Sequence, residues 1–275
     1  MFTRTIKSVA AENRLLLLVA ILLVGFVVLA VSTGPGGTGR TGGVPDFQSL
    51  VAGPERKTEF FAFMRPLLES QNEEVLRQRQ RLLEIQGEDE LGYFERRWLT
   101  ALAEQYEIAT EDDDGNPFDD QALISRLLPR VDVVPVSLGL AQAAKESGWG
   151  TSRFARQGNN YFGEWCFSEG CGIVPGARAD GRTHEVEAFA SPADSVASYV
   201  QNINTHRSYK SFRDARKAQR ERKGPLSSMR LAEELSQYSE RRGAYVDEIK
   251  QLIITNRLDA PRQAAAERVA SESTP

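Results

Sequence analysis

The feature that most constrains this chain is an uncharged apolar run near its N-terminus, LLLLVAILLVGFVVLAV, residues 15–31. As a helix the run would be ~26 Å long at 1.5 Å per residue, close to the ~30 Å of bilayer hydrocarbon. Arg4, Lys7 and Arg14 precede it, and Arg40 is isolated after it. This bias of positive charge keeps the N-terminal end in the cytoplasm and sends the remainder across the membrane.

Two outcomes are compatible with the run. We favour an uncleaved signal anchor at 15–32, with residues 1–14 in the cytoplasm and the catalytic part in the periplasm, held by the inner membrane. The alternative is a signal peptide cleaved after Val28-Leu29-Ala30, with secretion to the periplasm, although the apolar run is long and starts late for one. The Gly/Thr/Pro-rich segment at 33–46 then predicts a flexible tether.

Beyond the tether, the spacing of apolar residues is mostly helical. Pro66 is expected to kink or break the first helix. The acidic stretch at 111–120 lacks an EF-hand glycine in register and a closing glutamate, so it predicts a turn before a helix rather than a calcium loop. Predicted helices cover residues 55–86, 88–109, 119–128 and 135–147, and three more lie between Pro192 and residue 256.

One segment, residues 158–190, has a different character. Glycine, aromatic and β-branched residues dominate it, which indicates a small β-hairpin lobe with Asp180-Gly181 at its turn. The fold class is therefore mainly α (α+β). The predicted organisation is a helical N-terminal part at 47–130, a helical domain carrying the lobe at 131–258, and a disordered tail at 259–275.

Charge and cysteine content exclude several functions. The 34 Lys+Arg residues against 38 Asp+Glu give a net charge of −4, which offers no case for nucleic-acid binding. Cys166 and Cys171, with His184 and His206, make only a marginal ligand set for zinc, so no metal or cofactor is expected. The two histidines are expected to be structural and hydrogen-bonded.

Two local features leave alternatives open. Outside the cytoplasm Cys166 and Cys171 are expected to form a disulfide at the root of the lobe, with two unpaired thiols as the alternative. The basic segment at 207–223 is either a solvated helix face or a surface for anionic lipid headgroups and the carboxylates of stem peptides.

A carboxylate, Glu146, ends the helix at 135–147. Gln142, Ala143 and Gly139 share its helix face, at spacings of four, three and seven residues. That face is nearly bare of bulk, which is what the wall of a cleft for a polymeric substrate requires.

The end of that helix also favours an acid. In the last turn the helix dipole disfavours a charged carboxylate, so the pKa of Glu146 is expected to rise, as a general acid requires. Gly148 fits a left-handed helix stop, and Trp149 is placed to pack over the turn and exclude water. The alternative is a helix-end glutamate paired with Arg153 or Arg156.

The stretch LAQAAKESGWGTSRFARQGNNYFGEW, residues 140–165, resembles the glucosaminidase domain of bacterial peptidoglycan hydrolases. These form glycoside hydrolase family 73 of the lysozyme-like superfamily. The stretches GRTHEVEAF, SVASYVQNINTHRSY and LSQYSERRGAYVDEI resemble the Bax-like branch of that family. The similarity covers about residues 130–256 and implies a lysozyme-like helical domain.

The resemblance implies cleavage of peptidoglycan glycan strands after N-acetylglucosamine, with Glu146 as the catalytic acid. Asn160 and Tyr238 match cleft residues of the family, although Asn160 also suits a turn that it caps itself. Tyr245 matches a family tyrosine and is expected in the core. The candidates for contact with substrate are Asn160, Tyr238, Trp149, Phe162 and Gln142.

The second catalytic group is not fixed by any motif. Glu185, Glu187 and Asp180 on the lobe are candidates for a second carboxylate, and Glu164 and Glu169 lie near its start. Two routes are slightly favoured over a lobe carboxylate: a substrate-assisted one, in which the N-acetyl oxygen attacks the anomeric carbon, and a water held without a strict base. Alternatives to hydrolysis are a lytic transglycosylase on the same fold and a non-catalytic glycan-binding or scaffold protein of the cell envelope.

Overall fold

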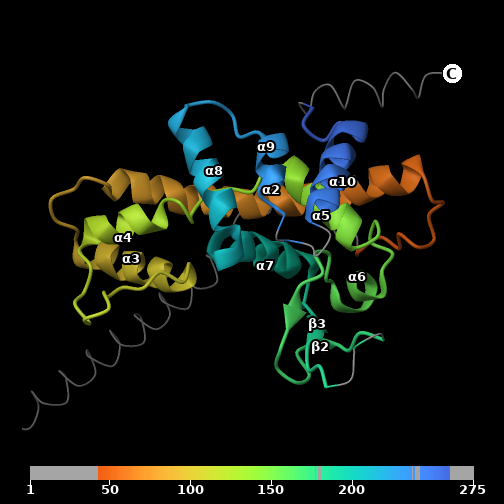
Figure 1. Ribbon diagram of the computed structural model, residues 1–275, viewed down its shortest axis with the longest axis horizontal. Helices are drawn as coiled ribbons and strands as arrows, with labels where there is room; N and C mark the ends of the chain where they lie inside the picture. Colours follow the sequence, from red (N-terminus) through yellow and green to blue (C-terminus); the bar gives the residue numbers. More distant parts are fainter. Residues whose placement is uncertain (1–42, 177, 179–180, 237, 239–241, 261–275) are drawn as a thin grey trace, which may run out of the picture. The chain divides into compact units, whose positions relative to one another are not determined.

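One long helix runs through the fold. The computed structural model describes residues 43–176, 178, 181–236, 238 and 242–260, and within it helix α2 spans Pro54–Ile85 (Figure 1). The predicted break at Pro66 is wrong, because the helix continues through it. A proline removes one helical hydrogen bond, but Met64 and Leu68 on either side are fully buried, and their packing holds the adjacent turns in place.

Two shorter helices follow as a pair, α3 (Tyr93–Gln105) and α4 (Asp120–Leu127). The acidic stretch between them forms the predicted turn, since the Asp112 carboxylate accepts from the backbone N–H groups of Asp114 and Asn116. Asp119 caps α4 by accepting from the backbone N–H of Ala122 at 2.7 Å. Carboxylates therefore shape a turn and a helix start here, as the sequence predicts.

Helices α5 (Val136–Glu146) and α7 (Pro192–Thr205) pack on α2. A methyl group built on Gly139 would lie 2.7 Å from Cδ2 of Leu68, so a larger residue here would force the Leu68 side chain on α2 to shift. Gln142 and Ala143 are fully buried as well. The prediction that this bare face forms the wall of a cleft is therefore wrong: its small residues permit close helix packing instead.

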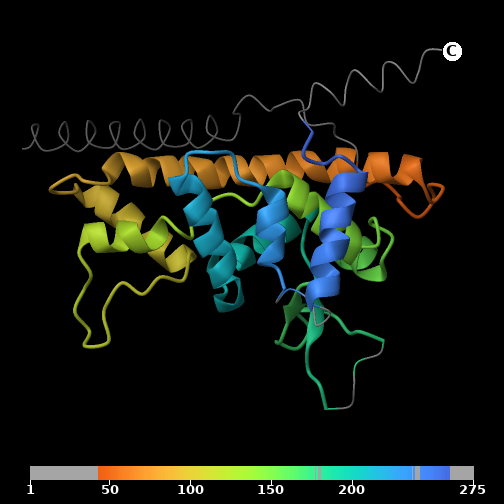
Figure 2. The same ribbon diagram turned by 45° about the horizontal axis from the view of Figure 1, so that its top comes forward.

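The lobe contains three short antiparallel strands rather than a single hairpin. They are β1 (Trp165–Cys166), β2 (Gly172–Ile173) and β3 (Glu185–Glu187), in the order β1-β3-β2. The predicted disulfide between Cys166 and Cys171 is present, with Cα atoms 6.2 Å apart. Asp180 lies outside the described residues. Both views place β2 and β3 on the opposite side of α7 from α2 (Figures 1 and 2).

The C-terminal helices complete the core. Helix α10 (Arg242–Thr255) packs against both α5 and α9 (Ser228–Glu233), so Tyr245 and Ile249 on α10 are buried. The architecture is mainly α with a small sheet, in agreement with the predicted class. The remaining elements are α6 (Arg153–Gly158), η1 (Arg207–Tyr209) and α8 (Lys210–Glu221).

None of the helices that the structure describes combines the length and the apolar character needed to span a membrane. The anchor predicted at 15–32 lies outside the described residues, as do most of the tether and residues 261–275 of the tail.

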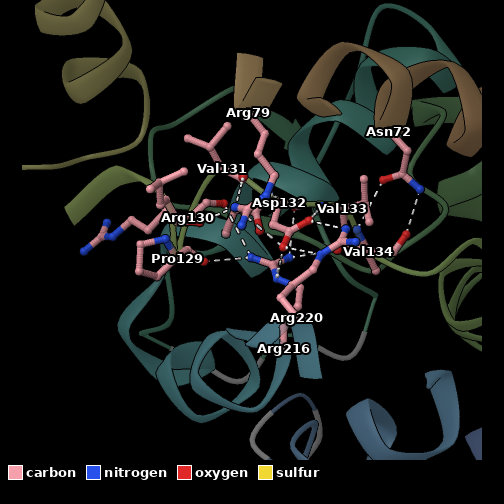
Figure 3. A network of polar contacts seen from close by, with 12 residues as sticks. Asn72, Arg79, Pro129, Arg130, Val131, Asp132, Val133, Val134, Arg216 and Arg220 are labelled. Carbon is pink, nitrogen blue, oxygen red and sulfur yellow. Dashed lines mark hydrogen bonds and ion pairs between the residues drawn. The ribbon is translucent and has the colours of Figure 1, made fainter. Parts of the chain in front are cut away.

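The basic segment contributes to the core rather than only to the surface (Figure 3). Arg216 is fully buried, and its guanidinium donates to the backbone carbonyls of Asp132, Val133 and Pro129 at 2.9–3.0 Å. Arg220 binds the Asp132 carboxylate through two hydrogen bonds of 3.0 and 2.8 Å. Neither interpretation of the segment foresaw this, because charge alone does not show which arginines find buried carbonyls.

Helix α2 joins the same network. Arg79 donates to the carbonyls of Leu128 and Val131 and lies 3.7 Å from the Asp132 carboxylate. A cavity of about 370 Å³ lies beside these groups, between α2, α4 and α8. Burial opposes the charge of Asp132, but its arginine neighbours prevail and hold its pKa below the ordinary value. The network therefore ties α2 to α8.

We predict that Asp132→Asn lowers the free energy of unfolding by about 3–5 kcal/mol, because it leaves buried guanidinium groups without their counter-charge. Urea denaturation measures this change. Lys210→Ala, which removes an exposed ion pair with Asp214, is the control and should change the free energy by less than about 1 kcal/mol. Equal effects of the two substitutions would contradict the role of Asp132.

Candidate active site

Glu146 is placed by an abrupt helix stop. Gly148, Trp149 and Gly150 have φ angles of +57°, +62° and +76°, so three successive residues adopt the left-handed region. The backbone N–H of Trp149 donates to the carbonyl of Ala144 at 2.8 Å, which closes the helix end as predicted for Gly148. Ser147 fixes the turn further by accepting from the Gly150 N–H at 2.8 Å.

The Glu146 carboxyl is partly buried and forms no ion pair with any residue that the structure describes. Arg153 instead donates to the carbonyl of Val174, and Lys145 pairs with Glu248. Neither of the helix-end ion pairs left open by the sequence, with Arg153 or with Arg156, is therefore formed among the described residues. Burial is the main cause that raises the pKa of Glu146, while a Tyr245 hydrogen bond and the Lys145 charge oppose it.

A chain of hydrogen bonds leads to this carboxyl. The Tyr199 hydroxyl donates to Oε1 of Gln142 at 2.6 Å, and Nε2 of Gln142 donates to the Tyr245 hydroxyl at 3.0 Å. With its oxygen already accepting, Tyr245 has its own O–H free to donate to Glu146. The chain crosses α7, α5 and α10 and therefore ends on a donor that is directed at Glu146.

Gly163 lies directly opposite the carboxyl. A methyl group built on it would be 3.6 Å from Oε2 of Glu146, and its φ of +69° favours glycine. Asn160 fixes this turn: its Oδ1 accepts from the N–H groups of Gly163 and Glu164 at 2.7 and 3.1 Å. Gly163 itself is exposed to solvent, and Glu146 is partly exposed.

Comparisons with known proteins give two matches to this chain. A family model described as mannosyl-glycoprotein endo-beta-N-acetylglucosaminidase, of the glucosaminidase family, matches residues 122–258. The chain is 32% identical over 206 residues to protein bax of Escherichia coli (strain K12), which covers 75% of this chain and 72% of that protein. No solved structure was found to match the chain.

The chain belongs to the glucosaminidase family. Its similarity to protein bax places it among the Bax-like members.

In this glucosaminidase domain, several residues predicted to touch substrate have their polar atoms engaged within the protein. Gln142 uses both ends of its amide in the chain described above. Asn160 is 2% exposed, and its Nδ2 donates to the carbonyls of Glu164 and Glu187, both at 2.9 Å. The geometry thus supports the turn role that the sequence left open for Asn160.

The aromatic candidates also pack inside the domain. Phe162 stacks on Tyr199, with ring centroids 3.9 Å apart. The Tyr238 hydroxyl donates to the carbonyl of Phe162 at 2.9 Å, and its ring stacks on Tyr245. Trp149 contacts Phe60 and Phe61 on α2. Phe162 is therefore buried, whereas Trp149 and Tyr238 are half-buried.

The candidates for a second carboxylate occupy different places. Glu185 is buried in the lobe beside the disulfide, and its carboxylate accepts from the N–H groups of Gly170 and Gly172 at 3.2 and 2.8 Å. Glu187 is half-buried, and burial raises its pKa. Glu187 is therefore freer than Glu185 to act on a substrate.

The sequence analysis assigned no role at the site to three residues that the structure places there or beside it. Tyr245 was expected only in the core, yet it hydrogen-bonds Glu146. Burial raises the pKa of Tyr209 to about 12, and the charges of Glu164 and Glu146 add to the shift, so its hydroxyl lies near both carboxyls. Trp165 is 56% exposed and stacks on His184 at the start of the lobe. Periodicity marks the tyrosines as apolar and does not show where a hydroxyl points.

We predict that Tyr245→Phe raises the pKa of Glu146 further, because the lost hydrogen bond stabilises the charged form. Carbon NMR of labelled glutamate side chains, titrated in both proteins, measures the change. The matched control is Tyr93→Phe, an exposed tyrosine on α3. A titration of Glu146 that is unchanged in Tyr245→Phe would rule out the proposed donor.

Proposed function

We propose that this protein is a peptidoglycan hydrolase that cleaves the glycan strand as an N-acetylglucosaminidase, with Glu146 as the general acid. The observation that carries the proposal is the placement of Glu146. Its carboxyl is partly buried, free of ion pairs, supplied with an oriented donor, and opposite the exposed backbone of Gly163. Membership of the glucosaminidase family supports a glycan substrate.

Two opposing effects act on the pKa of the Glu146 carboxyl: burial raises it, and the Tyr245 hydrogen bond lowers it. Burial favours the neutral acid, which donates its proton to the glycosidic oxygen as the bond from that oxygen to the anomeric carbon breaks. The departing sugar then leaves as an alcohol, and Glu146 becomes a carboxylate. The Tyr245 hydroxyl donates to that carboxylate, so the charge formed in the step has a hydrogen-bond partner already in place.

Cleavage is proposed to be substrate-assisted. The acetamido oxygen attacks the anomeric carbon as the glycosidic bond breaks, and an oxazolinium ring forms. Water then attacks the same carbon and gives a proton to the Glu146 carboxylate, so the ring opens, the acetamide is restored and the acid is regenerated. The Tyr238 hydroxyl already donates to the carbonyl of Phe162, so we propose that the Tyr209 hydroxyl forms the hydrogen bond to the acetamide. The Glu185 carboxylate is already held by backbone N–H groups. Glu187 is the lobe carboxylate that remains open as an alternative base.

The exposed aromatic residues of the lobe fit an extended substrate. Trp165 and Phe167 are 56% and 72% exposed and lie two residues apart along the chain, shortly after Gly163. Exposed apolar side chains gathered beside a candidate site are typical of ligand-binding surfaces. We propose that the domain works in the periplasm, held at the inner membrane by residues 15–32.

We predict that Glu146→Gln lowers the rate of release of dye-labelled fragments from peptidoglycan by about 10²–10⁴-fold, because an amide cannot supply the proton. Binding to insoluble peptidoglycan should be retained. Glu104→Gln, an exposed glutamate on α3, is the matched control and should keep the wild-type rate. A wild-type protein that binds but releases nothing would favour the non-catalytic scaffold.

The pH dependence follows from the direction of the pKa shift. The working form of Glu146 is protonated, so kcat/KM should be highest below its raised pKa and fall as the pH rises through it. Initial rates on soluble glycan strands between pH 4 and 10 measure this profile. A rate independent of pH into the alkaline range is incompatible with a general acid at this position.

A further inference from the structure

A lysine lies next to the candidate acid in the chain but pairs with a different carboxylate. Lys145 directly precedes Glu146, and its ammonium forms an ion pair with Glu248 on α10. The side chains of Lys145 and Glu248 are 23% and 37% exposed, so the pair is partly shielded from solvent. The steps proposed above give neither residue a role.

Tyr245 connects this ion pair to the acid. Glu248 follows Tyr245 by three residues on α10, which places both on one face of that helix. The Lys145 ammonium lies 5.7 Å from the centre of the Tyr245 ring, and the hydroxyl of the same ring donates to Glu146. A cation, an anion and the candidate acid therefore lie around one aromatic ring.

Helix packing determines which carboxylate Lys145 binds. Helix α10 packs against α5, so Glu248 lies across the contact between the two helices and reaches the ammonium. If Glu248 carried no charge, the nearest carboxylate to Lys145 along the chain would be Glu146. The flexible four-carbon stem of a lysine allows its ammonium to change partners.

The two charges of the pair act on Glu146 in opposite directions. A nearby cation favours the ionised form of a carboxyl, and a nearby anion disfavours it. The Lys145 charge accordingly lowers the pKa of Glu146, and the Glu248 charge raises it. While the pair is intact, the two effects offset each other and burial remains the main influence.

Other titratable groups belong to the elements next to Glu146 and to the turn opposite it. They are common to every variant below, so their effects cancel in a comparison with wild type. These groups are Lys57, Arg153, Arg156, Glu164, Tyr209 and Tyr238.

We propose that Glu248 is a positioning residue: it holds the Lys145 ammonium on α10, so that Glu146 has no ion pair and stays neutral. The inference rests on the proposed function for its effect on cleavage. Its effect on the titration of Glu146 can be measured without any activity.

The first test is Glu248→Gln, which keeps the shape of the side chain but removes its charge and releases the ammonium. Both consequences favour ionised Glu146, so its pKa should fall below the wild-type value. Carbon NMR of labelled glutamate side chains, titrated in the full-length proteins, measures the change. An unchanged titration of Glu146 would overturn the proposal.

A matched control exists on the same helix. Glu233 on α9 pairs with Lys250 on α10 at 2.7 Å, and Lys250 is 24% exposed, close to the value for Lys145. Glu233→Gln breaks this second pair between helices and should leave the titration of Glu146 as in wild type. An equal shift in Glu233→Gln and Glu248→Gln would show a general loss of packing and contradict the assignment.

A second variant keeps the proposal testable if Glu248→Gln does not fold. Lys145→Met removes the cation and leaves the Glu248 charge unbalanced, so the pKa of Glu146 should rise above the wild-type value. The two single variants therefore shift the titration in opposite directions, which a merely structural role of the pair does not predict. A fall or no change in Lys145→Met would count against the proposal.

Activity gives an independent readout. The ratio of kcat/KM between wild type and Glu248→Gln should be near one at pH 4 and about three- to tenfold at pH 8, because less of the variant's acid is protonated there. A ratio that is the same at both pH values would contradict a role in setting the charge of Glu146. If the titrations shift as expected but wild type releases no fragments, the proposed function fails and the positioning role of Glu248 stands.

Discussion

The hydrogen-bond chain from Tyr199 through Gln142 to Tyr245 is the interaction on which the candidate site depends. Gln142 is fully buried, and an unpaired amide there would carry the full penalty of desolvation. Two tyrosines satisfy the Gln142 amide: Tyr199 on α7 donates to its oxygen, and Tyr245 on α10 accepts from its nitrogen. The same arrangement places the Tyr245 hydroxyl against Glu146, so the packing of the core and the orientation of the acid have a common cause.

A second constraint is the approach of α5 to α2. The absence of a side chain at Gly139 lets Leu68 of α2 pack closely against the α5 backbone. Residues 137–144 of α5 are buried, and the stop at Gly148 leaves Glu146 partly exposed at the C-terminal end of the helix. Asp132 contacts Arg79 on α2 and Arg220 on α8, and these contacts hold the two helices together.

Much of the fold could be predicted because local rules determine it. The helical periods, the acidic turn before α4, the Gly148 stop and the pairing of Cys166 with Cys171 all depend on neighbours in the sequence. The three-stranded lobe was simplified to a hairpin, because strands of two or three residues carry almost no periodic signal. Pro66 was expected to break α2, because the packing on both sides of it is a long-range effect.

The site was harder to predict for a related reason. The small residues on the Glu146 face of α5 are equally compatible with a cleft wall and with a helix contact, and only the position of Leu68 decides between them. The polar groups of Asn160 and Gln142 have partners distant in the sequence, so their use inside the protein was not visible. The local pattern of a carboxylate before a glycine stop suits an acid and an ion-paired glutamate equally. The choice of Glu146 as the acid rests on the resemblance to the glucosaminidase family, and its role stays a prediction.

The most direct test of the account is mass spectrometry of purified peptidoglycan digested with the full-length protein. Cleavage by the proposed route predicts fragments with N-acetylglucosamine at a free reducing end, absent when Glu146 is replaced by glutamine. Fragments that end in anhydro-muramic acid, or intact strands after prolonged digestion, would contradict it.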